Sequence, residues 1–350
     1  MEIVIEVKWL PCLSRCLSFG GFCIPLRKST GHTPVQTSLF QFMAKEVKKK
    51  SQIWTIGGGK GGIGKSFMIS SIACCLAGKQ QRVVLVDLDL GGANLHTFLG
   101  MQRPKVTLTD FFDKKAPLAS LVVETGIPNL SLLTGMVNSL APDSIRHTQK
   151  ARLFKQIRAL DADYILIDLG AGTHFHTIDA YLLGDKMMAV IVPEMISLEN
   201  MYYFIKNVFF RKLINALTEA GLKDLVASTW KDRDKYHIEN INQLTDHLHG
   251  ISPSVAGVVD REIAGFTFDL LLNMVRNDQD IMVGMSAKSV CMKYFGFKAR
   301  YSGYVEYDEV VSRCINRRLP YLQTHPTSKT AKSLETLTTT LQENKQLIAT

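Results

Sequence analysis

The sequence lacks the features that define several large classes of protein. Its 350 residues contain no run of about 18 uninterrupted apolar residues, so no membrane-spanning helix is predicted. The seven cysteines form no C-x-x-C pair and no spacing typical of metal ligands. Such an odd, scattered set gives no support to an iron–sulfur protein and favours a reducing, cytoplasmic setting.

Strong positive charge is missing from most of the chain as well. Of the formal net charge of +9, residues 1–50 carry +5, because eight Lys and Arg residues stand there against three Glu. The other 300 residues therefore carry only +4. Charge alone is weak evidence that the folded body binds DNA.

The first 42 residues differ in character from the rest of the chain. They mix Cys, Gly, Ser and Pro without periodicity, whereas Met43 stands just ahead of the first core strand pattern. We expect residues 1–42 to be disordered or not to belong to the translated protein. With 46% hydrophobic residues, the chain can bury one large α/β core, which we place at residues 43–325, followed by a C-terminal helix at 326–350.

A glycine-rich loop between residues 57 and 66 is the strongest signal in the chain. An apolar run ends at Ile56, and helical spacing begins at Phe67, which predicts a strand, a loop and a helix start. Glycines let successive backbone N–H groups point inward, and the helix N-terminus adds positive potential, so the loop should bind phosphate. The expected contacts are Gly58, Gly59, Lys60, Gly61, Gly62, Ile63, Gly64, Lys65 and Ser66.

Within this loop, Lys65 would neutralise the β- and γ-phosphates, and the Ser66 hydroxyl would ligate Mg²⁺. The alternative is a glycine-rich turn with incidental lysines.

Two further apolar runs end in carboxylates. The first leads into Asp87 and Asp89, and the second leads into Asp168 and then Gly170. Buried strands of a parallel sheet deliver their functional residues at their carboxyl ends, so these side chains should meet near the glycine loop. The alternative is that these carboxylates merely cap turns.

Together these segments resemble the MinD/ParA class of ATPases with the deviant Walker A motif K-G-G-x-G-K-[ST], here Lys60 to Ser66. The resemblance implies a three-layer P-loop NTPase fold, with a mostly parallel central sheet flanked by helices. It implies ATP and Mg²⁺ as ligands. It also implies that Lys60 reaches across an ATP-bound homodimer to the partner's nucleotide.

The same resemblance assigns roles to the other segments. Asp89 would position or activate the attacking water, and Asp87 would support Mg²⁺ or its loop. Asp168 would hold Mg²⁺ through a water, and the Gly170 N–H would sense the γ-phosphate. The strand-end Asn273 would read the adenine edge, and Arg276 would flank the base.

The rest of the chain yields weaker predictions. Ser197 should cap a helix at 198–213. Residues 209–265 are predicted to be an inserted helical segment and a candidate partner surface, with a longer surface excursion as the alternative.

The final helix has few cations and no aromatic residues, so we expect it to dock on the body rather than bind a membrane. His174 and His176 lack a third metal ligand nearby.

Among the MinD/ParA class, the motifs look most like the FlhG/FleN branch, which controls flagellar placement and number. The branch's short N-terminal D-Q motif is not seen before Lys50. The resemblance implies a cytoplasmic ATPase, slow without a partner, with at most peripheral contact at the inner face of the membrane. A ParA-like partition ATPase that binds DNA non-specifically is the main alternative, and an iron–sulfur carrier of the same fold is a third.

Overall fold

The chain divides into two compact units, residues 1–49 and 50–350. In the first, strands β1 (Cys16–Phe19) and β2 (Phe22–Pro25) pair antiparallel. The expectation for residues 1–42 otherwise lies outside the described residues and stays a prediction. The computed structural model describes residues 16–19, 22–25, 50–89, 92–135, 147–296 and 298–347.

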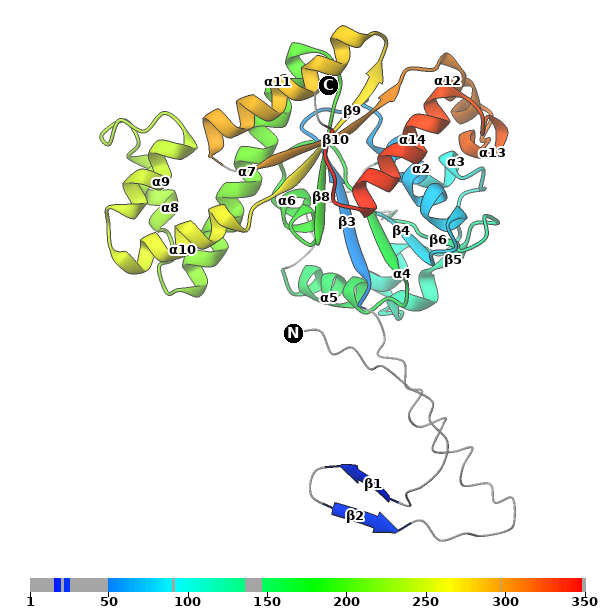
Figure 1. The fold of residues 1–350 in the computed structure, drawn as a ribbon, viewed down its shortest axis with the longest axis horizontal. Helices are drawn as coiled ribbons and strands as arrows, with labels where there is room; N and C mark the ends of the chain where they lie inside the picture. Colours follow the sequence, from blue (N-terminus) through cyan, green and yellow to red (C-terminus); the bar gives the residue numbers. More distant parts are fainter. Residues whose placement is uncertain are drawn as a thin grey trace. The chain divides into compact units, whose positions relative to one another are not determined.

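An eight-stranded sheet organises the second unit (Figure 1). Its strand order is β10-β9-β8-β3-β7-β4-β6-β5, and all neighbours run parallel except β5 and β6. The predicted, mostly parallel sheet is therefore confirmed. The strands are β3 (Gln52–Gly57), β4 (Val83–Asp87), β5 (Val123–Glu124), β6 (Leu130–Leu133), β7 (Tyr164–Asp168), β8 (Lys186–Ile191), β9 (Phe268–Val275) and β10 (Ala299–Glu306).

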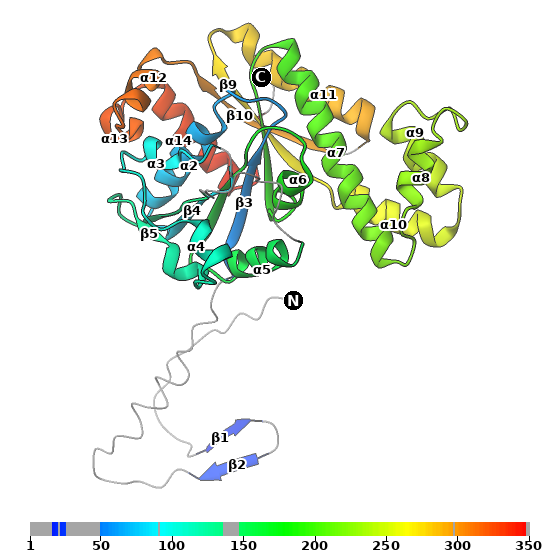
Figure 2. The same cartoon turned by 180° about the vertical axis from the view of Figure 1, so that it is seen from behind.

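Helices cover both faces of this sheet because successive strand side chains point to opposite sides. Trp54 and Ile56 belong to the core under α2, whereas Ile53 belongs to the core on the other face. The first face carries α2 (Lys65–Gly78), α3 (Leu95–Phe98), α12 (Glu309–Asn316), α13 (Tyr321–Thr324) and α14 (Lys329–Gln342). The second carries α4 (Leu108–Asp113), η1 (Leu118–Leu121), α5 (His147–Arg158), α6 (Phe175–Tyr181), α7 (Met195–Glu219) and α11 (Asp278–Phe295), and Figure 2 shows the arrangement from behind.

The segment between α7 and β9 is helical, as predicted for residues 209–265. It contains α8 (Leu225–Lys231), α9 (Ile241–His249) and α10 (Pro253–Ala264), which group beyond α7 in both views (Figures 1 and 2). Apolar side chains of α9 and α10 are buried in the core that continues from α7. Whether this segment is an insertion that binds a partner stays a proposal.

The prediction that Ser197 caps a helix at 198–213 is wrong. Helix α7 begins at Met195, and its N-cap residue is Glu194. The Ser197 side chain is buried, and its hydroxyl accepts a hydrogen bond of 3.0 Å from the Val192 N–H. Ser197 therefore ties the first turn of α7 to the end of β8.

The C-terminal helix α14 docks on the body, as predicted. The Ser328 hydroxyl caps its start by accepting from the Ala331 N–H at 3.0 Å. Leu334, Leu337 and Leu341 recur at helical spacing and are buried against the core of the first face. Across the described parts of the chain, no helix is both long and apolar enough to cross a membrane.

Replacing Leu334 with Ala should lower the free energy of unfolding by about 2–5 kcal/mol, because it removes a fully buried side chain from the α14 contact. Urea unfolding followed by circular dichroism measures this. The exposed neighbour Glu335 on the same helix is the control, and Glu335→Ala should change stability by less than about 0.5 kcal/mol. Equal effects of the two variants would contradict the docked position of α14.

Candidate functional site

The glycine loop joins β3 to α2 and folds as a phosphate-binding nest. Gly62 and Gly64 have φ of 79° and 86°, a left-handed conformation that favours glycine. A Cβ at Gly59 would lie 2.0 Å from the Asn200 carbonyl oxygen of α7, so only glycine fits there. The Lys65 ammonium turns back to donate to the Lys60 carbonyl at 3.1 Å. The loop is thus a tight curl with a cation held inside it.

Two carboxylates stand beside this loop because β4 and β7 pair in parallel. Their register sets Asp87 opposite Asp168 at the same edge of the sheet. Asp87 accepts hydrogen bonds from the N–H groups of Asp89, at 3.1 Å, and Leu95, at 3.2 Å. These two bonds fix the turn that follows β4, and they leave Asp87 buried.

Of the two carboxylates, Asp168 gives the stronger indication of a cation site. Its side chain is 1% exposed, and its Oδ1 has no hydrogen-bond partner among the described residues. The Ser66 hydroxyl and the Lys65 ammonium interact with the same carboxylate. A buried carboxylate oxygen without a partner is costly unless a cation or water satisfies it. A hydroxyl and a carboxylate at the end of a P-loop form an oxygen donor set that suits Mg²⁺.

Burial is also the main cause of the pKa shifts at this edge of the sheet. Desolvation, together with the charge of Asp168, raises the pKa of Asp87 to about 8. Desolvation raises the pKa of Asp168 to about 7, although Ser66 and Lys65 act in the opposite direction. Burial lowers the pKa of Lys65, and the charges of Asp168 and Asp89 partly restore it. The site therefore lacks positive charge that a bound cation would supply.

Asp89 lies between two glycines. A Cβ at Gly170 would lie 3.0 Å from Asp89 Oδ1, and a Cβ at Gly92 would lie 3.2 Å from Oδ2. The carboxylate therefore packs directly on the backbone that follows β7. This contact brings the loop that follows β4 next to the loop that follows β7.

Part of the glycine loop, Ser66 and Asp89 line a cavity of about 430 Å³, whereas Asp87, Asp168 and Gly170 do not belong to its lining. Its lining includes the predicted site residues Gly61, Gly62, Gly64, Lys65, Ser66, Asp89 and Asn273. At its other end, Asn273 is buried and donates from Nδ2 to the Ile63 carbonyl at 2.9 Å, so its amide N–H₂ supports the glycine loop. That contact joins the end of β9 to the phosphate nest.

Several predicted residues lie outside the cavity lining, namely Gly58, Gly59, Lys60, Ile63, Asp87, Asp168, Gly170 and Arg276. The Arg276 guanidinium packs 3.8 Å from the ring centroid of Tyr307, and it is Tyr307 that lines the cavity. Lys60 Nζ pairs with Glu194 Oε2 at 3.1 Å, at the start of α7. The early lysine thus points away from the cavity of its own chain.

Sequence reasoning missed the wall formed by the end of β10 and by α12. Glu306, Tyr307 and Asp308 line the cavity there, together with Val311 and Ser312. The signal was a strand ending in polar residues beside the strand that carries Asn273, because β10 pairs with β9 in parallel. A metal role for the two histidines after β7 gains no support, since no group of three metal-binding side chains occurs in the described ranges.

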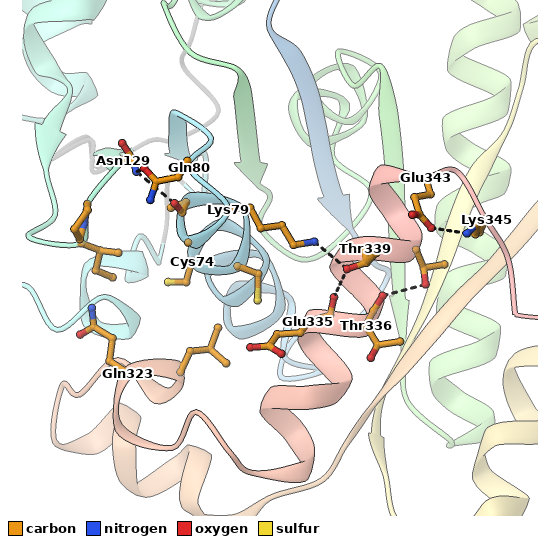
Figure 3. Close-up of a pocket in the computed structure, with 17 residues that line it drawn as sticks. Cys74, Lys79, Gln80, Asn129, Gln323, Glu335, Thr336, Thr339, Glu343 and Lys345 are labelled. Carbon is orange, nitrogen blue, oxygen red and sulfur yellow. Dashed lines mark hydrogen bonds and ion pairs between the residues drawn. The ribbon is translucent and has the colours of Figure 1, made fainter.

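A larger hollow lies elsewhere, between α2 and α14 (Figure 3). This groove of about 990 Å³ is lined by apolar and polar side chains, and some of the polar ones bond to one another. Lys79 donates to Thr339 at 2.8 Å, and Glu343 pairs with Lys345 at 2.7 Å, as the dashed lines show. Its size alone does not make it the functional site, because the phosphate nest with Lys65 and Ser66 lines the smaller cavity.

Comparison with known proteins agrees with this geometry. Residues 49–212 match the ParA family, described as the NUBPL iron-transfer P-loop NTPase. The septum site-determining protein MinD of Helicobacter pylori is 36% identical over 148 residues, which cover 42% of this chain and 54% of that protein. Antiactivator FleN of Pseudomonas aeruginosa is 27% identical over 157 residues, with coverage of 44% and 55%. The chain thus spans about half the length of these curated relatives.

Solved structures show the same fold. MinD of Pyrococcus horikoshii OT3, complexed with Mg-ADP, superposes with a TM-score of 0.57 at 21% identity and covers 84% of this chain and 97% of that one. MinD in a MinC:MinD complex from Aquifex aeolicus gives a TM-score of 0.54 at 17% identity, with coverage of 86% and 99%. The chain has the MinD/ParA P-loop NTPase fold. In residues 49–212 the chain is similar to proteins of the ParA/MinD type, and the FlhG/FleN branch is one of several related candidates.

Replacing Asp168 with Asn should stabilise the protein when nucleotide and Mg²⁺ are absent. The folded pKa values of about 8 for Asp87 and about 7 for Asp168 lie above the value near 4 expected in the unfolded chain. The folded state therefore holds protons that the unfolded chain releases, and stability falls as pH rises from about 4 to 8. We expect Asp168→Asn to raise the free energy of unfolding at pH 8 by about 1–3 kcal/mol and to flatten this fall.

Urea unfolding at pH 6 and pH 8 in the presence of EDTA measures this effect. The exposed carboxylate Asp113, changed to Asn, is the control and should leave the pH dependence unchanged. An Asp168→Asn variant with the wild-type pH dependence would show that ionisation of Asp168 does not destabilise the folded protein.

Proposed function

We propose that this protein is an ATP-dependent switch that dimerises with ATP and Mg²⁺ bound and hydrolyses ATP slowly. The observation that carries the proposal is the orphaned Asp168 oxygen, buried beside Ser66 at the edge of the phosphate nest. The likeness to MinD and FleN supports the same interpretation. MinD of Pyrococcus horikoshii is complexed with Mg-ADP, which supports nucleotide and Mg²⁺ as the ligands of this site.

Different residues of the site would bind the phosphates and the Mg²⁺ ion. The glycine nest and Lys65 would hold the phosphates, while Ser66 and Asp168 would hold Mg²⁺. Mg²⁺ would supply the charge that neutralises the phosphoryl oxygens during transfer. Asp87 would act indirectly, because both of its oxygens already accept backbone N–H groups and thereby fix the loop after β4.

Asp89 is the proposed group that orients the attacking water. It lines the cavity together with Lys65 and Ser66. Its packing on Gly170 supports this role, because the Gly170 N–H would face the γ-phosphate and the Asp89 carboxylate would then be a proton acceptor nearby. A carboxylate in this position can accept a proton from water while Lys65 and Mg²⁺ balance the negative charge.

Lys60 is the proposed dimer contact. Its ammonium lies outside the cavity of its own chain and pairs with Glu194 at the surface. A lysine in the phosphate loop that does not face its own phosphates has the reach to serve a second subunit. Lys60 therefore supports a homodimer in which each chain completes the other's site.

The cellular task is a finer part of the same proposal. Likeness to FleN and MinD supports a role in the placement or number of a cell structure such as the flagellum. The helical segment at 209–265 is the proposed surface for a protein partner, and contact with a membrane or DNA is expected to be weak. Retention on DNA that needs ATP and falls steeply with salt would instead favour the partition alternative.

Iron transfer, which the family description mentions, is not part of this proposal. Burial raises the pKa of the Cys74 thiol to about 12 and that of Cys75 to about 11, which disfavours the thiolate form of both. A metal ligand must be a thiolate. No cysteine of the described residues belongs to a group of three metal-binding side chains.

Asp89→Ala should lower steady-state phosphate release by about 100-fold or more while leaving ATP binding within a few fold, because it removes the proton acceptor and not a phosphate contact. Phosphate release measures the first quantity, and competition with a fluorescent ATP analogue measures the second. Asp113→Ala is the exposed control. Hydrolysis at the wild-type rate in Asp89→Ala would remove Asp89 from the mechanism.

Lys60→Ala should bind ATP yet remain monomeric. The clearest test uses the Asp89→Ala background, in which ATP is not consumed, and compares elution volume and light scattering with and without Lys60. Asp89→Ala with ATP and Mg²⁺ should elute as a dimer, and the double variant should elute as a monomer. Lys332→Ala on the exposed side of α14 is the matched lysine control. A dimer that forms without Lys60 would refute its proposed role.

A further inference from the structure

Cations and aromatic rings gather on the surface where α8 packs against α7. Tyr203, Lys206 and Phe210 lie on one side of α7, because residues three and four apart are neighbours on a helix. Trp230 lies near the end of α8, its ring meets that of Phe210 edge to face with centroids 4.8 Å apart, and Arg233 follows the helix. We call these residues the cation–aromatic patch. The cavity beside the glycine loop is not lined by any of them.

Lys206 is the central cation of this patch, and it lacks a counterion. Its Nζ lies 4.9 Å from the ring centroid of Trp230. The ring centroids of Tyr203 and Phe210 lie 5.7 and 5.9 Å from the same atom. In the part of the chain that the structure describes, no carboxylate pairs with this ammonium. Burial lowers the pKa of Lys206, and the nearby charge of Arg233 lowers it further, so this position is short of negative charge.

Arg233 is the second cation of the patch, and it is only weakly neutralised. Its guanidinium carbon lies 5.6 Å from the Trp230 ring centroid, so two cations contact one indole ring. Its Nε lies 3.9 Å from Asp234 Oδ1, and the side chain of that aspartate is 93% exposed. An exposed ion pair at this distance contributes little. Most of the positive charge on Lys206 and Arg233 therefore stays uncompensated.

The patch can be reached from solvent and has the composition of an interface. Tyr203 is 55% exposed, and the Arg233 side chain is 44% exposed. Lys206, Phe210 and Trp230 are partly buried. Trp, Tyr and Arg are the residues that contribute most to binding energy at protein interfaces. Rings and cations that already pack on one another lose little conformational freedom when a partner binds.

We propose that the cation–aromatic patch binds an acidic segment of the protein partner, whose carboxylates pair with Lys206 and Arg233 while an apolar side chain packs on Tyr203. The inference rests on the proposed function, which assigns a partner to residues 209–265, and it adds the chemistry of that partner. Carboxylates here would neutralise both cations. The surrounding rings would keep water from these ion pairs, which strengthens them.

The arrangement of charge favours a peptide over a nucleic acid. Asp232 and Asp234 are exposed and flank Arg233 in the chain. A nucleic-acid strand carries a phosphate at every nucleotide, so these aspartates would repel part of it. A peptide can place carboxylates opposite the two cations and uncharged side chains opposite the two aspartates. An acidic segment with apolar residues therefore fits this surface better than a continuous row of phosphates.

Selection of random displayed peptides on the full-length protein tests the proposal. Peptides are selected in parallel on the wild type, on Lys206→Ala/Arg233→Ala and on the control Lys332→Ala/Arg317→Ala. The control removes one lysine and one arginine from exposed positions outside the patch. We expect the wild type and the control to enrich peptides with acidic residues beside an aliphatic or aromatic one. The patch variant should not enrich them.

Dissociation constants of the most enriched peptide then measure the role of each side chain. Lys206→Ala, Arg233→Ala and Tyr203→Ala should each weaken binding by about tenfold, and Lys206→Arg, which keeps the charge, should weaken it less. Circular dichroism confirms that each variant is folded. The same peptide with amides in place of its carboxylates should bind the wild type at least about tenfold more weakly. That measurement needs no variant of the protein.

The possible negative results differ from one another. Enrichment of peptides without acidic residues, equal enrichment on the patch variant, or no enrichment on the wild type would overturn the proposal. A single-stranded oligonucleotide that binds more tightly than the peptide, and loses its affinity in Lys206→Ala/Arg233→Ala, would assign the patch to nucleic acid instead. Wild-type protein that binds the acidic peptide but not ATP would contradict the proposed function and leave the peptide site in place.

Discussion

Asp87 and Asp168 end two neighbouring parallel strands, and the pairing of β4 with β7 buries them side by side. Two carboxylates out of water repel one another, and desolvation raises the pKa of each. The nearest ammonium, that of Lys65, is itself buried and is drawn to the Lys60 carbonyl. The edge of the sheet is thus short of positive charge, and a divalent cation would stabilise both the carboxylates and the phosphates that the nest attracts.

The burial of these carboxylates at the ends of parallel strands explains why the central site could be predicted from the sequence. Strands that are buried on both faces read as continuous apolar runs, so the carboxylates that end them stand out, as Asp87 and Asp168 do. The glycine loop could also be recognised from the sequence. Close contacts with Asn200 and Asn273 exclude larger residues at Gly59 and Gly64. Element order, sheet direction and the phosphate end of the cavity could therefore be predicted from spacing and residue type.

The predictions that failed or were missed depend on contacts between segments distant in sequence. Ser197 has the chemistry of a helix cap, but its hydroxyl accepts a bond from Val192 and the helix starts earlier. Arg276 packs on Tyr307, 31 residues further along the chain and just after the next strand, a contact that sequence reasoning missed, and the expectation that Arg276 flanks the base stays a prediction. No local pattern encodes which of two side chains lies nearer a cavity, because the order of β9 and β10 in the sheet decides it.

The ion pair between Lys60 and Glu194 bears on how a dimer could form. Both side chains are well exposed, at 39% and 59%, so the pair contributes at most about 1 kcal/mol. Breaking it costs little compared with what a triphosphate of a second subunit could offer the same ammonium in a site closed from water. Glu194 is also the N-cap residue of α7, whose first turns press on Gly59. Release of Lys60 would therefore remove a side-chain contact between the phosphate loop and the start of α7, the helix that leads to the segment proposed to bind a partner.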